Sequence, residues 1–483
     1  MPIYGLTQAF PIGFNGDGMA RLDADVVVVG AGLSGLTAAF RLAQQGVRLR
    51  VIESASRPGG VIGSVRRDGA LYEQGPNSGL DTTPLVNELF AAVGIAAERI
   101  DASAEAARRY ILRDGRLAAL PTSPPAFLAT GLFSWKAKLA LLREPFVKPA
   151  AADAEETVGA FVRRRLGAEF LDYAIEPFVA GIYAGDPEKL SVPAAFPRLF
   201  ALEQKYGSLI RGQVAGARER KKSAEKAKNA AVSFSFREGM QTLTDALARG
   251  LQADFGVRAA GLRRDTDGSF VLDCERGDER FELRSRSVVL AVPAYEAARI
   301  IGQTAPPAAA ALQAIAYPPV ASVASCYRRA DVAHPLDGFG FLAPRRESPP
   351  ILGCLFSSSM FAGRADPSTV LLTTFVGGVR SAPLALKGEE ELAAGVAAAL
   401  QGYLGARQPL WQVVTRWPQA IPQYTLGHLQ RIAAVERAEA QAPGLRFCAN
   451  WRGGVSVADC IKSAHATVEA VRQFLSRTAP GAA

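Results

Sequence analysis

The first residues whose types and spacing could do chemistry are three glycines and an acid. Gly30, Gly32 and Gly35 form the pattern G-x-G-x-x-G, and Glu53 follows 18 residues after the last glycine. In a turn of this kind the first glycine permits a tight bend, the second lets the backbone approach a pyrophosphate, and the third lets a helix pack closely on a strand. The acid can accept hydrogen bonds from ribose hydroxyls and disfavours a 2′-phosphate. The pattern therefore predicts a bound adenine dinucleotide other than NADP.

The surrounding sequence predicts the strand–helix–strand unit that must position these residues. Asp25–Val29 is typical of a strand that is buried on both faces of a parallel sheet. Residues 36–45 predict a helix that ends at Gly46, and residues 47–52 predict a second strand. The helix N-terminus would favour phosphate charge. A lone glycine pattern is weak and can be a chance turn, but one in this context, with the acid in register, is a strong indication.

The residues that follow resemble the flavin amine-oxidase superfamily. Residues 57–60 (RPGG) match an Arg-x-Gly-Gly turn that comes after the ribose-binding acid in that superfamily, and residues 73–78 (EQGPNS) match a segment near the flavin ring. The resemblance implies FAD, with the arginine and the glycine amides near its phosphates. A glycine at 75 would let the backbone lie against the flat ring without a side-chain clash. Without the resemblance, Arg57 would be interpreted as a surface arginine that closes a turn.

Two further segments have the same resemblance and imply that the cofactor domain is split. Residues 445–449 predict a strand and residues 458–468 a helix, with a glycine-containing turn between them. In the superfamily this strand and helix pack on the N-terminal sheet, and the helix dipole would stabilise the reduced flavin; an ordinary helix start is the alternative. In the middle of the chain, residues 236–247 resemble a helix that begins near the cofactor, and residues 256–260 resemble a strand that holds the adenine near Ala259.

Several longer segments are more specific. They resemble the oxygen-dependent, FAD-containing protoporphyrinogen oxidases, nearer the plant and myxobacterial forms than the animal form. The resemblance covers nearly the whole chain from about residue 23, but not residues 211–230. The segments are 176–187, 190–196, 338–342, 357–361 and 416–429. The cofactor-binding residues that the motifs and the resemblance imply are Gly30, Ala31, Gly32, Leu33, Ser34, Gly35, Glu53, Ser54, Arg57, Gly60, Gly75, Pro76, Asn77, Ser78, Ala259, Trp417, Gly454, Val455, Ser456 and Val457.

The same resemblance implies a site for a porphyrinogen, a large apolar macrocycle that bears carboxylates and needs a wide hydrophobic slot with a few basic anchors. Arg109 would hold a propionate, because a guanidinium can bind a carboxylate through two hydrogen bonds. Arg108 would face the other way on a strand, toward solvent. Leu342 and Phe361 would enclose the substrate rings, and Gly181 would abut them. Without the resemblance, Leu342 and Phe361 would be interpreted as ordinary core residues.

The implied reaction removes six electrons from protoporphyrinogen IX in three hydride transfers to the flavin, each followed by reoxidation by O2 with release of hydrogen peroxide. The sequence holds no His–Asp or paired-carboxylate constellation that demands a role, so no residue is assigned as an acid or base and catalysis is expected to rest on positioning. The main alternative is a coproporphyrinogen III oxidase forming coproporphyrin III, whose four-carboxylate substrate should need more basic residues than Arg109. An amine oxidase is more distant, since Trp451 has no convincing aromatic partner. A relative without flavin is disfavoured by the intact glycine pattern.

Composition narrows the remaining classes. The five cysteines form no C-x-x-C and the chain has three histidines, so neither a disulfide scaffold nor a metal site is predicted. The net charge of +9 is concentrated in residues 211–228, which carry seven basic and two acidic residues. This stretch is either a solvated helix or loop, or a contact with an anionic membrane surface. Nucleic acid is not predicted as a partner, because no aromatic residues interleave with the basic ones.

Two other segments bear on membranes and targeting. Residues 1–18 hold no basic residue and no signal-peptide pattern, so we expect an unstructured leader, with Met19 a candidate for the natural start. Residues 117–135 are uncharged and long enough to span a bilayer, but their three prolines should break any helix there. We expect either a segment at a membrane interface or a buried loop over the core.

We therefore expect an α/β protein with a Rossmann-type FAD-binding domain assembled from discontinuous segments, a sheet-based substrate domain and an inserted helical domain. The expected partners are a porphyrinogen, O2 and, peripherally, a membrane, with a homodimer as a further candidate assembly. The expected location is the cytoplasm at the inner membrane, or an organelle membrane in a eukaryote. The expected divisions are 1–22 for the leader, 23–103, 233–318 and 415–483 for the FAD-binding domain, 104–124 and 319–414 for the substrate domain, and 125–232 for the helical, membrane-associating domain.

Overall fold

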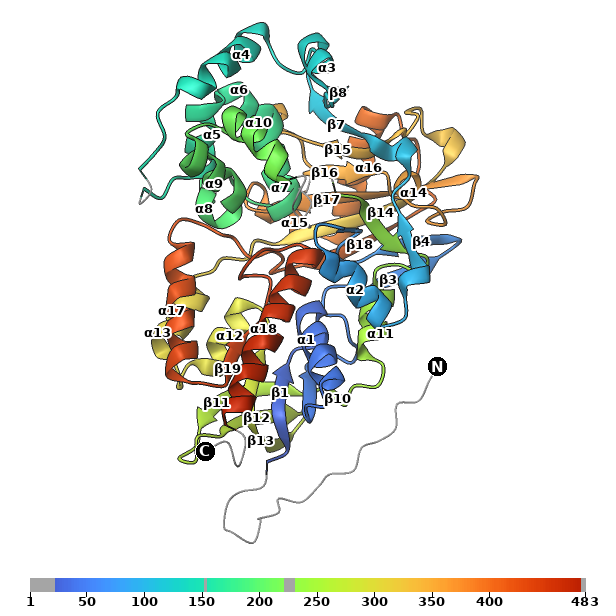
Figure 1. The fold of residues 1–483 in the computed structure, drawn as a ribbon. Coiled ribbons are helices and arrows are strands. Elements are labelled where there is room, and N and C mark those ends of the chain that lie inside the picture. Colours follow the sequence, from blue (N-terminus) through green and yellow to red (C-terminus); the bar gives the residue numbers. More distant parts are fainter. Residues whose placement is uncertain (1–21, 152–153, 221–230, 479–483) are drawn as a thin grey trace.

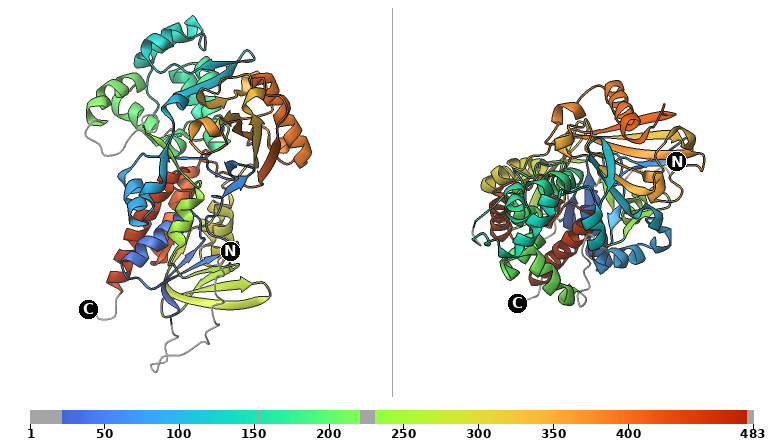
Figure 2. Two further views of the ribbon diagram at one scale, coloured as in Figure 1. Left: turned by 90° about the vertical axis from the view of Figure 1, so that its right-hand side faces the viewer. Right: turned by 90° about the horizontal axis from the view of Figure 1, so that it is seen from above.

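The computed structural model describes residues 22–151, 154–220 and 231–478. These residues form two seven-stranded sheets at opposite ends of the molecule, with a helical unit beside the second sheet (Figures 1 and 2). The predicted α/β class is confirmed. All but the last residue of the predicted leader, and residues 221–228 of the basic stretch, lie outside the described residues.

The first sheet unites strands from the start, the middle and the end of the chain. β1 pairs in parallel with β2 and β13, and β19 joins the sheet through β13. In spatial order the strands are β10 (Ala253–Phe255), β2 (Leu49–Glu53), β1 (Ala24–Val29), β13 (Glu279–Leu290), β12 (Phe270–Arg276) and β11 (Arg258–Arg264), with β19 (Leu445–Phe447) beside β13. The prediction that distant segments assemble this sheet is confirmed.

Helices cover both faces of the first sheet, which explains the run of valines in β1. Val26 packs with α1 (Leu33–Gln44) and α18 (Val457–Arg477), whereas Val27 packs with α12 (Ala294–Ile301) on the other face. Successive side chains of a strand point to opposite faces, so a strand covered on both sides is apolar throughout. The other helices around this sheet are α2 (Pro84–Ala92), α11 (Gln241–Ala248), α13 (Pro306–Gln313) and α17 (His428–Gln441).

Two predicted boundaries differ from the structure. α1 begins at Leu33, directly after the second glycine of the turn, and not at residue 36. The strand predicted for residues 256–260 begins later, at Arg258, where β11 starts. β10 ends at Phe255, and Gly256 has a φ of +69°, which is not a strand conformation. All five cysteines are buried and none forms a disulfide.

The second sheet is mixed and has one face covered by α16 (Glu389–Leu404), which packs against residues such as Val323 and Leu372. Its strands, in spatial order, are β18 (Trp411–Trp417), β14 (Val320–Arg328), β17 (Thr369–Gly377), β16 (Gly353–Leu355), β15 (Gly338–Leu342), β7 (Arg108–Arg113) and β8 (Arg116–Ala119). The predicted division between residues 414 and 415 falls inside β18, which pairs with β14 along its whole length. That strand therefore belongs to one sheet only.

The helical unit packs beside the second sheet (Figure 1). Its main helices are α3 (Pro124–Ala129), α4 (Trp135–Ala140), α5 (Val158–Arg165), α7 (Glu176–Tyr183), α9 (Pro197–Tyr206) and α10 (Leu209–Arg220). Two prolines start α3, which corrects the expectation that they prevent a helix: the first positions of a helix need no N–H donor. Among the described helices, none is long and apolar enough to cross a bilayer.

Candidate functional site

The first glycine turn has the geometry that its spacing predicts. Gly30 has φ +102°, and a Cβ atom there would lie 2.6 Å from the Ala291 carbonyl oxygen. A Cβ atom on Gly35 would lie 2.0 Å from the Gly30 carbonyl oxygen. A Cβ atom on Gly32, in contrast, would meet no atom within 4 Å. The protein's own packing therefore requires Gly30 and Gly35, whereas Gly32 borders open space that a ligand can enter.

The predicted second turn and the start of α1 border this same space. The Gly59 N–H donates to the Ala31 carbonyl oxygen at 2.8 Å, and a Cβ atom on Gly60 would lie 3.3 Å from the Gly32 Cα. α1 has no side-chain cap and no acidic residue in its first turn, which contains Ser34. Uncapped N–H groups at a helix start bind anions, so the two turns fit a pyrophosphate.

Glu53 occupies the last position of β2 and ties the first glycine turn to the residues that follow β2. One carboxylate oxygen accepts the Ala31 N–H at 2.7 Å. The other accepts the Ala55 N–H at 2.7 Å and the Ser54 hydroxyl at 3.2 Å. Each carboxylate oxygen can accept more than one hydrogen bond, so the acid can hold the backbone and still receive a ribose hydroxyl.

Arg57 closes its own loop, as the alternative interpretation expected. Its guanidinium donates to the carbonyl oxygens of Pro58, Gly60 and Ile62 at distances of 2.8 to 3.2 Å. A contact with the cofactor phosphates therefore stays a prediction for this residue.

The segment before Ala259 lies beside Glu53. The Val257 N–H donates to the Glu53 carbonyl oxygen at 2.9 Å, which places the start of β11 near the predicted ribose site. The Ala259 carbonyl oxygen accepts a hydrogen bond from Arg299 at 2.5 Å. An adenine contact at Ala259 stays a prediction.

The Gly75–Ser78 segment is partly exposed, and the residue before it, Gln74, contacts the second sheet. A Cβ atom on Gly75 would lie 2.1 Å from the Val61 carbonyl oxygen, so only glycine fits there. The Trp417 indole N–H, at the end of β18, donates to the Gln74 carbonyl oxygen at 3.0 Å. The structure thus brings together two predicted flavin contacts that lie more than 300 residues apart in the chain.

The C-terminal turn returns to the first glycine turn, as predicted for a split domain. Cys448, just after β19, contacts the Ser34 carbonyl oxygen at 3.9 Å. Unlike α1, α18 is capped by its own side chains: the Ser456 hydroxyl accepts the Asp459 N–H at 3.2 Å, and the Asp459 carboxylate accepts the Ser456 N–H at 3.4 Å. Gly454 has φ +128°, and a Cβ atom there would lie 2.4 Å from the same carboxylate. This turn is therefore shaped largely by the protein itself.

The start of α11 is occupied by side chains as well. The Met240 N–H donates to the buried Glu73 carboxylate at 3.0 Å, and the Gln241 N–H donates to the Ser64 hydroxyl at 3.1 Å. Burial raises the pKa of Glu73, although Arg364 lies 3.1 Å from its carboxylate. Glu73 thus orders the segment next to Gly75, a role that the sequence pattern did not indicate.

The register of the second sheet decides which side chains share a face. Arg109 pairs with Gly340, Leu342 pairs with Gly353, and the pairing continues across β17 and β14 to β18. Paired residues lie on the same face, and alternate residues of each strand do too. The face opposite α16 therefore carries Arg109, Ile111, Leu342, Leu355, Phe375 and Trp417.

Arg109 and Arg108 have opposite surroundings. Arg108 forms an ion pair with Asp337, whose carboxylate also accepts the Tyr110 hydroxyl at 2.7 Å. Arg109 is exposed and lies 5.3 Å above the Phe339 ring, and no described carboxylate is within ion-pair distance of it. The prediction that the two arginines face opposite ways is confirmed, and Arg109 remains able to bind an anion.

Gly181 and Leu342 meet where α7 approaches β15. A Cβ atom on Gly181 would lie 2.7 Å from a Leu342 methyl group, although Gly181 itself is exposed. A side chain at 181 would therefore collide with Leu342, so the two residues pack directly against each other. The substrate contacts expected of Gly181 and Leu342 stay predictions.

Phe361 differs from its predicted setting. It is 2% exposed and packs with Met360 and Ala106 under the partly exposed Phe339. Phe339 is the ring that contacts Arg109, and a bulge in the pairing of β15 with β7 at this residue turns it there. The enclosing role assigned to Phe361 stays a prediction, and Phe339, within the segment 338–342, is a neighbour of the site that its sequence alone did not single out.

Comparisons with known proteins define the class. The family model of the flavin containing amine oxidoreductases matches residues 33–472, so the chain belongs to this family. The chloroplastic protoporphyrinogen oxidase of Nicotiana tabacum is 34% identical, over 96% of this chain and 88% of its own length. The coproporphyrinogen III oxidase of Bacillus subtilis (strain 168) is 28% identical, over 93% of this chain and 98% of its own length. A crystal structure of a protein from Exiguobacterium sp. 255-15 has a TM-score of 0.78 at 24% identity, and the match covers 93% of this chain and 99% of that one.

The chain is therefore a flavin-dependent oxidoreductase, and its cofactor is FAD. The open space at Gly32, the uncapped start of α1 and the acid at the end of β2 fit the phosphates and ribose of that cofactor. When bound, FAD supplies an electron acceptor for the substrate.

Proposed function

We propose that this chain uses FAD to oxidise protoporphyrinogen IX to protoporphyrin IX, with O2 as the final acceptor and H2O2 as the second product, in tetrapyrrole biosynthesis. The names of its relatives support this reaction. The observation that carries the proposal is the Arg109 guanidinium, which pairs with no described carboxylate and lies on the sheet face that also holds Leu342 and Trp417. A carboxylate attached to a large apolar ring is the ligand chemistry that suits this combination.

The chain's own residues contribute binding and orientation. Arg109 holds a propionate, and the Phe339 ring below the guanidinium limits its orientations. Gly181 lets the edge of the macrocycle approach the backbone of α7. The hydrogen bond from Trp417 to the Gln74 carbonyl oxygen keeps the substrate face next to the predicted flavin segment.

The coproporphyrinogen alternative needs more unpaired cations than the described residues near β15 offer. A substrate with four carboxylates should meet several free guanidinium groups, but the other arginines near β15 already have acidic partners. These pairs are Arg108 with Asp337, Arg345 with Asp186, and Arg380 with Glu176. Two carboxylates therefore suit this site better than four.

The decisive experiment is anaerobic mixing of the FAD-loaded protein with protoporphyrinogen IX or coproporphyrinogen III while flavin absorbance near 450 nm is followed. We expect faster bleaching with protoporphyrinogen IX, and recovery of the absorbance together with H2O2 after O2 is admitted. Faster bleaching by the four-carboxylate substrate would reverse the assignment.

We also infer that the helical unit contacts a lipid surface. In the part of this unit between residues 128 and 146, five large apolar side chains are exposed, up to 83% for Phe146. We call this set the apolar patch: it consists of Leu128, Trp135, Leu139, Leu142 and Phe146. Lys136, Arg143 and Lys148 are exposed around it, and the sole acid between residues 115 and 151 is the buried Glu144. Apolar groups with basic neighbours suit an anionic lipid surface.

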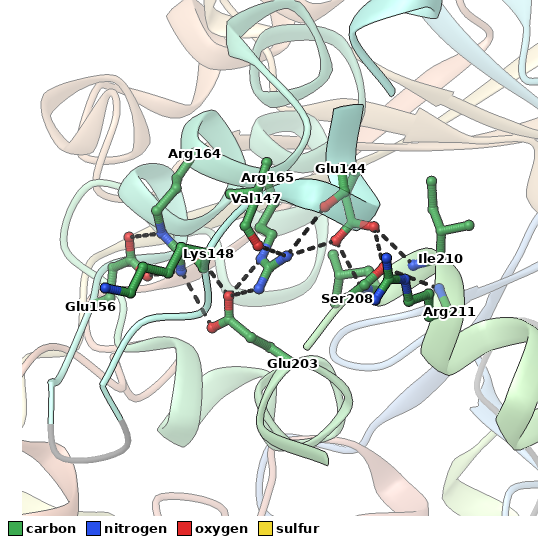
Figure 3. A network of polar contacts seen from close by, with 11 residues as sticks. Glu144, Val147, Lys148, Glu156, Arg164, Arg165, Glu203, Ser208, Ile210 and Arg211 are labelled. Carbon is green, nitrogen blue, oxygen red and sulfur yellow. Dashed lines mark hydrogen bonds and ion pairs between the residues drawn. The ribbon is translucent and has the colours of Figure 1, made fainter. Parts of the chain in front are cut away.

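A buried polar network around Glu144 lies next to the patch in the sequence (Figure 3). Glu144, next to the patch, accepts hydrogen bonds from Arg165 at 3.1 Å and from the Leu209 N–H at 2.8 Å. Arg165 also pairs with Glu203, and all three charged side chains are fully buried. The network therefore fixes the segment Leu141–Phe146 to α5, α9 and the start of α10. Breaking one partner would leave a buried charge without compensation.

Sedimentation with vesicles tests the lipid contact. We expect Leu142→Ser to reduce binding to vesicles that contain an anionic phospholipid, because it removes exposed apolar area from the patch. Leu386→Ser is the matched control, since Leu386 is 57% exposed but lies beside the second sheet. Equal binding of both variants and the wild type would contradict the inference. The homodimer stays a prediction, which light scattering on the same preparation tests.

A further inference from the structure

The segment Gln423–His428 lies between two parts of the proposed site. On one side it contacts the end of α7, the helix that carries Gly181. On the other side it contacts the turn Asn450–Gly454, which precedes α18 and the residues expected to contact the flavin. The motif patterns assign no role to this segment.

The Tyr424 hydroxyl joins the first and last residues of that turn. It donates to the Asn450 carbonyl oxygen at 2.6 Å and accepts the Gly454 N–H at 3.1 Å. A phenol has one donor and can accept as well, so both bonds form together. The ring is 2% exposed, and burial raises the pKa of Tyr424 well above its usual value, so the donor proton is retained.

His428 supports the same turn from the middle. Its imidazole stacks on the Tyr424 ring, with centroids 4.2 Å apart and planes inclined by 13°. Its Nε2 atom lies 3.0 Å from the Trp451 carbonyl oxygen, and because a carbonyl only accepts, Nε2 carries the proton of the neutral ring. Two stacked rings therefore hold three residues of one short turn.

The backbone around Tyr424 is fixed to the helical unit. The Ser191 N–H donates to the Tyr424 carbonyl oxygen at 2.8 Å, and the Gln423 amide donates to the Tyr183 carbonyl oxygen at 2.8 Å. The backbone of Tyr424 is thus held in place, so its hydroxyl can determine where the turn lies.

We propose that Tyr424 is a positioning residue for the cofactor, and that its hydroxyl holds the Asn450–Gly454 turn in the shape that FAD binding at the start of α18 requires. The inference rests on the proposed function and adds a residue that does not itself touch the reacting atoms. Without the hydroxyl, the Gly454 N–H and the Asn450 carbonyl oxygen lose their shared partner, and the two ends of the turn are no longer joined. FAD then binds to a turn that must first be ordered.

The test compares Tyr424→Phe with Tyr183→Phe. Tyr183 is a matched control because its ring is also buried and lies 5.8 Å from that of Tyr424, whereas its hydroxyl donates to the Ala195 carbonyl oxygen. The FAD dissociation constant of the apoprotein is measured by flavin fluorescence, and the flavin reduction potential by equilibration with a reference dye. We expect Tyr424→Phe to weaken FAD binding about tenfold and to shift the potential. The porphyrinogen KM should stay within about twofold, and Tyr183→Phe should change neither FAD property.

Equal FAD affinity and potential in Tyr424→Phe and the wild type would overturn the inference. If that variant fails to fold, hydrogen exchange in the wild-type protein decides: the Gly454 amide should exchange slowly, and exchange as fast as in an exposed loop overturns the inference as well. A wild-type protein that binds no FAD contradicts the proposed function itself. Unchanged FAD binding in the variant alone contradicts only the role of Tyr424.

Discussion

The cofactor side of this protein and its proposed substrate side differ in the groups that face the ligand. On the cofactor side they are backbone groups of glycine turns, held in place by carboxylates such as that of Glu53, which accepts the Ala31 N–H. On the substrate side they are side chains on one face of a sheet, with Arg109 as a cation that has no described acidic partner. We therefore expect FAD binding to be lost when a side chain is added to a glycine of the turns. We expect substrate binding to be weakened when a side chain such as that of Arg109 is removed.

The difference follows from how each ligand is recognised. Phosphates are bound by N–H groups that converge only if the backbone can approach closely, and any side chain at Gly30 or Gly35 occupies the position of another backbone atom. A macrocycle is bound by shape and by a few polar anchors, so each anchor carries more of the recognition. The variants below test this contrast, in order of decreasing effect.

The largest effect is expected from Gly35→Ala. The new methyl group would lie 2.0 Å from the Gly30 carbonyl oxygen, so α1 must shift away from the glycine turn. We expect loss of bound FAD and a decrease of about 3 kcal/mol in the free energy of unfolding. The ratio of flavin to protein absorbance and thermal melting measure both.

Gly46→Ala is the control for this glycine. Gly46 has φ +76°, but a Cβ atom there meets nothing within 4 Å, so the variant should lose only about 1 kcal/mol and keep its FAD. A Gly35→Ala protein that retains bound FAD and wild-type stability would contradict the contrast between the two regions.

Arg109→Ala should affect the substrate and leave the cofactor untouched. Loss of the charged hydrogen bonds to a carboxylate should lower kcat/KM for the porphyrinogen by about 10- to 100-fold, with normal FAD content. Arg108→Ala is the matched control and should stay within about twofold, because Arg108 already pairs with Asp337 on the other face. Steady-state kinetics decide, and equal losses in the two variants would refute the assignment.

Lowering the pH should decrease the free energy of unfolding through His428, which lies on the cofactor side. Burial lowers the pKa of His428 from 6.5 to about 4, with Glu155 and Arg431 as the charged neighbours. Between these values the unfolded chain binds a proton that the folded protein does not, so stability falls as the pH falls from 6.5 toward 4. We expect a loss of about 2 kcal/mol between pH 7.5 and pH 5, measured by urea unfolding.

The variant His428→Gln isolates this contribution, since glutamine can still donate to the Trp451 carbonyl oxygen but does not titrate. It should lose stability less steeply over the same pH range. An identical pH dependence in the two proteins would show that His428 is not the group responsible.

The smallest effect is expected from Phe339→Leu. The substitution keeps an apolar side chain but removes the ring that lies 5.3 Å from the Arg109 guanidinium. Loss of this contact should cost about 0.5–1 kcal/mol, which corresponds to a two- to fivefold increase in KM without a change in FAD content. A much larger loss of FAD would indicate that Phe339 belongs to the cofactor side.

Local sequence predicted the cofactor side well because its chemistry lies in consecutive residues. The glycine spacing, the valine strand and Glu53 describe one continuous unit, and the structure assembles it with α1 beginning only three residues early. The substrate side was less predictable. Strand alternation separated Arg108 from Arg109, but it could not show that Asp337, distant in sequence, pairs with Arg108 while no described carboxylate pairs with Arg109.

By itself, the sequence determined the βαβ unit, the split cofactor domain and the family, because these depend on turn chemistry, strand burial and motifs that span nearly the whole chain. Only the tertiary structure decided which groups meet. A bulge in β15 brings Phe339 to Arg109, a contact that the sequence did not single out. The fold also places Tyr424 against a turn 26 residues later. These outcomes depend on register and on side-chain packing between distant segments, and no local pattern of residues encodes them.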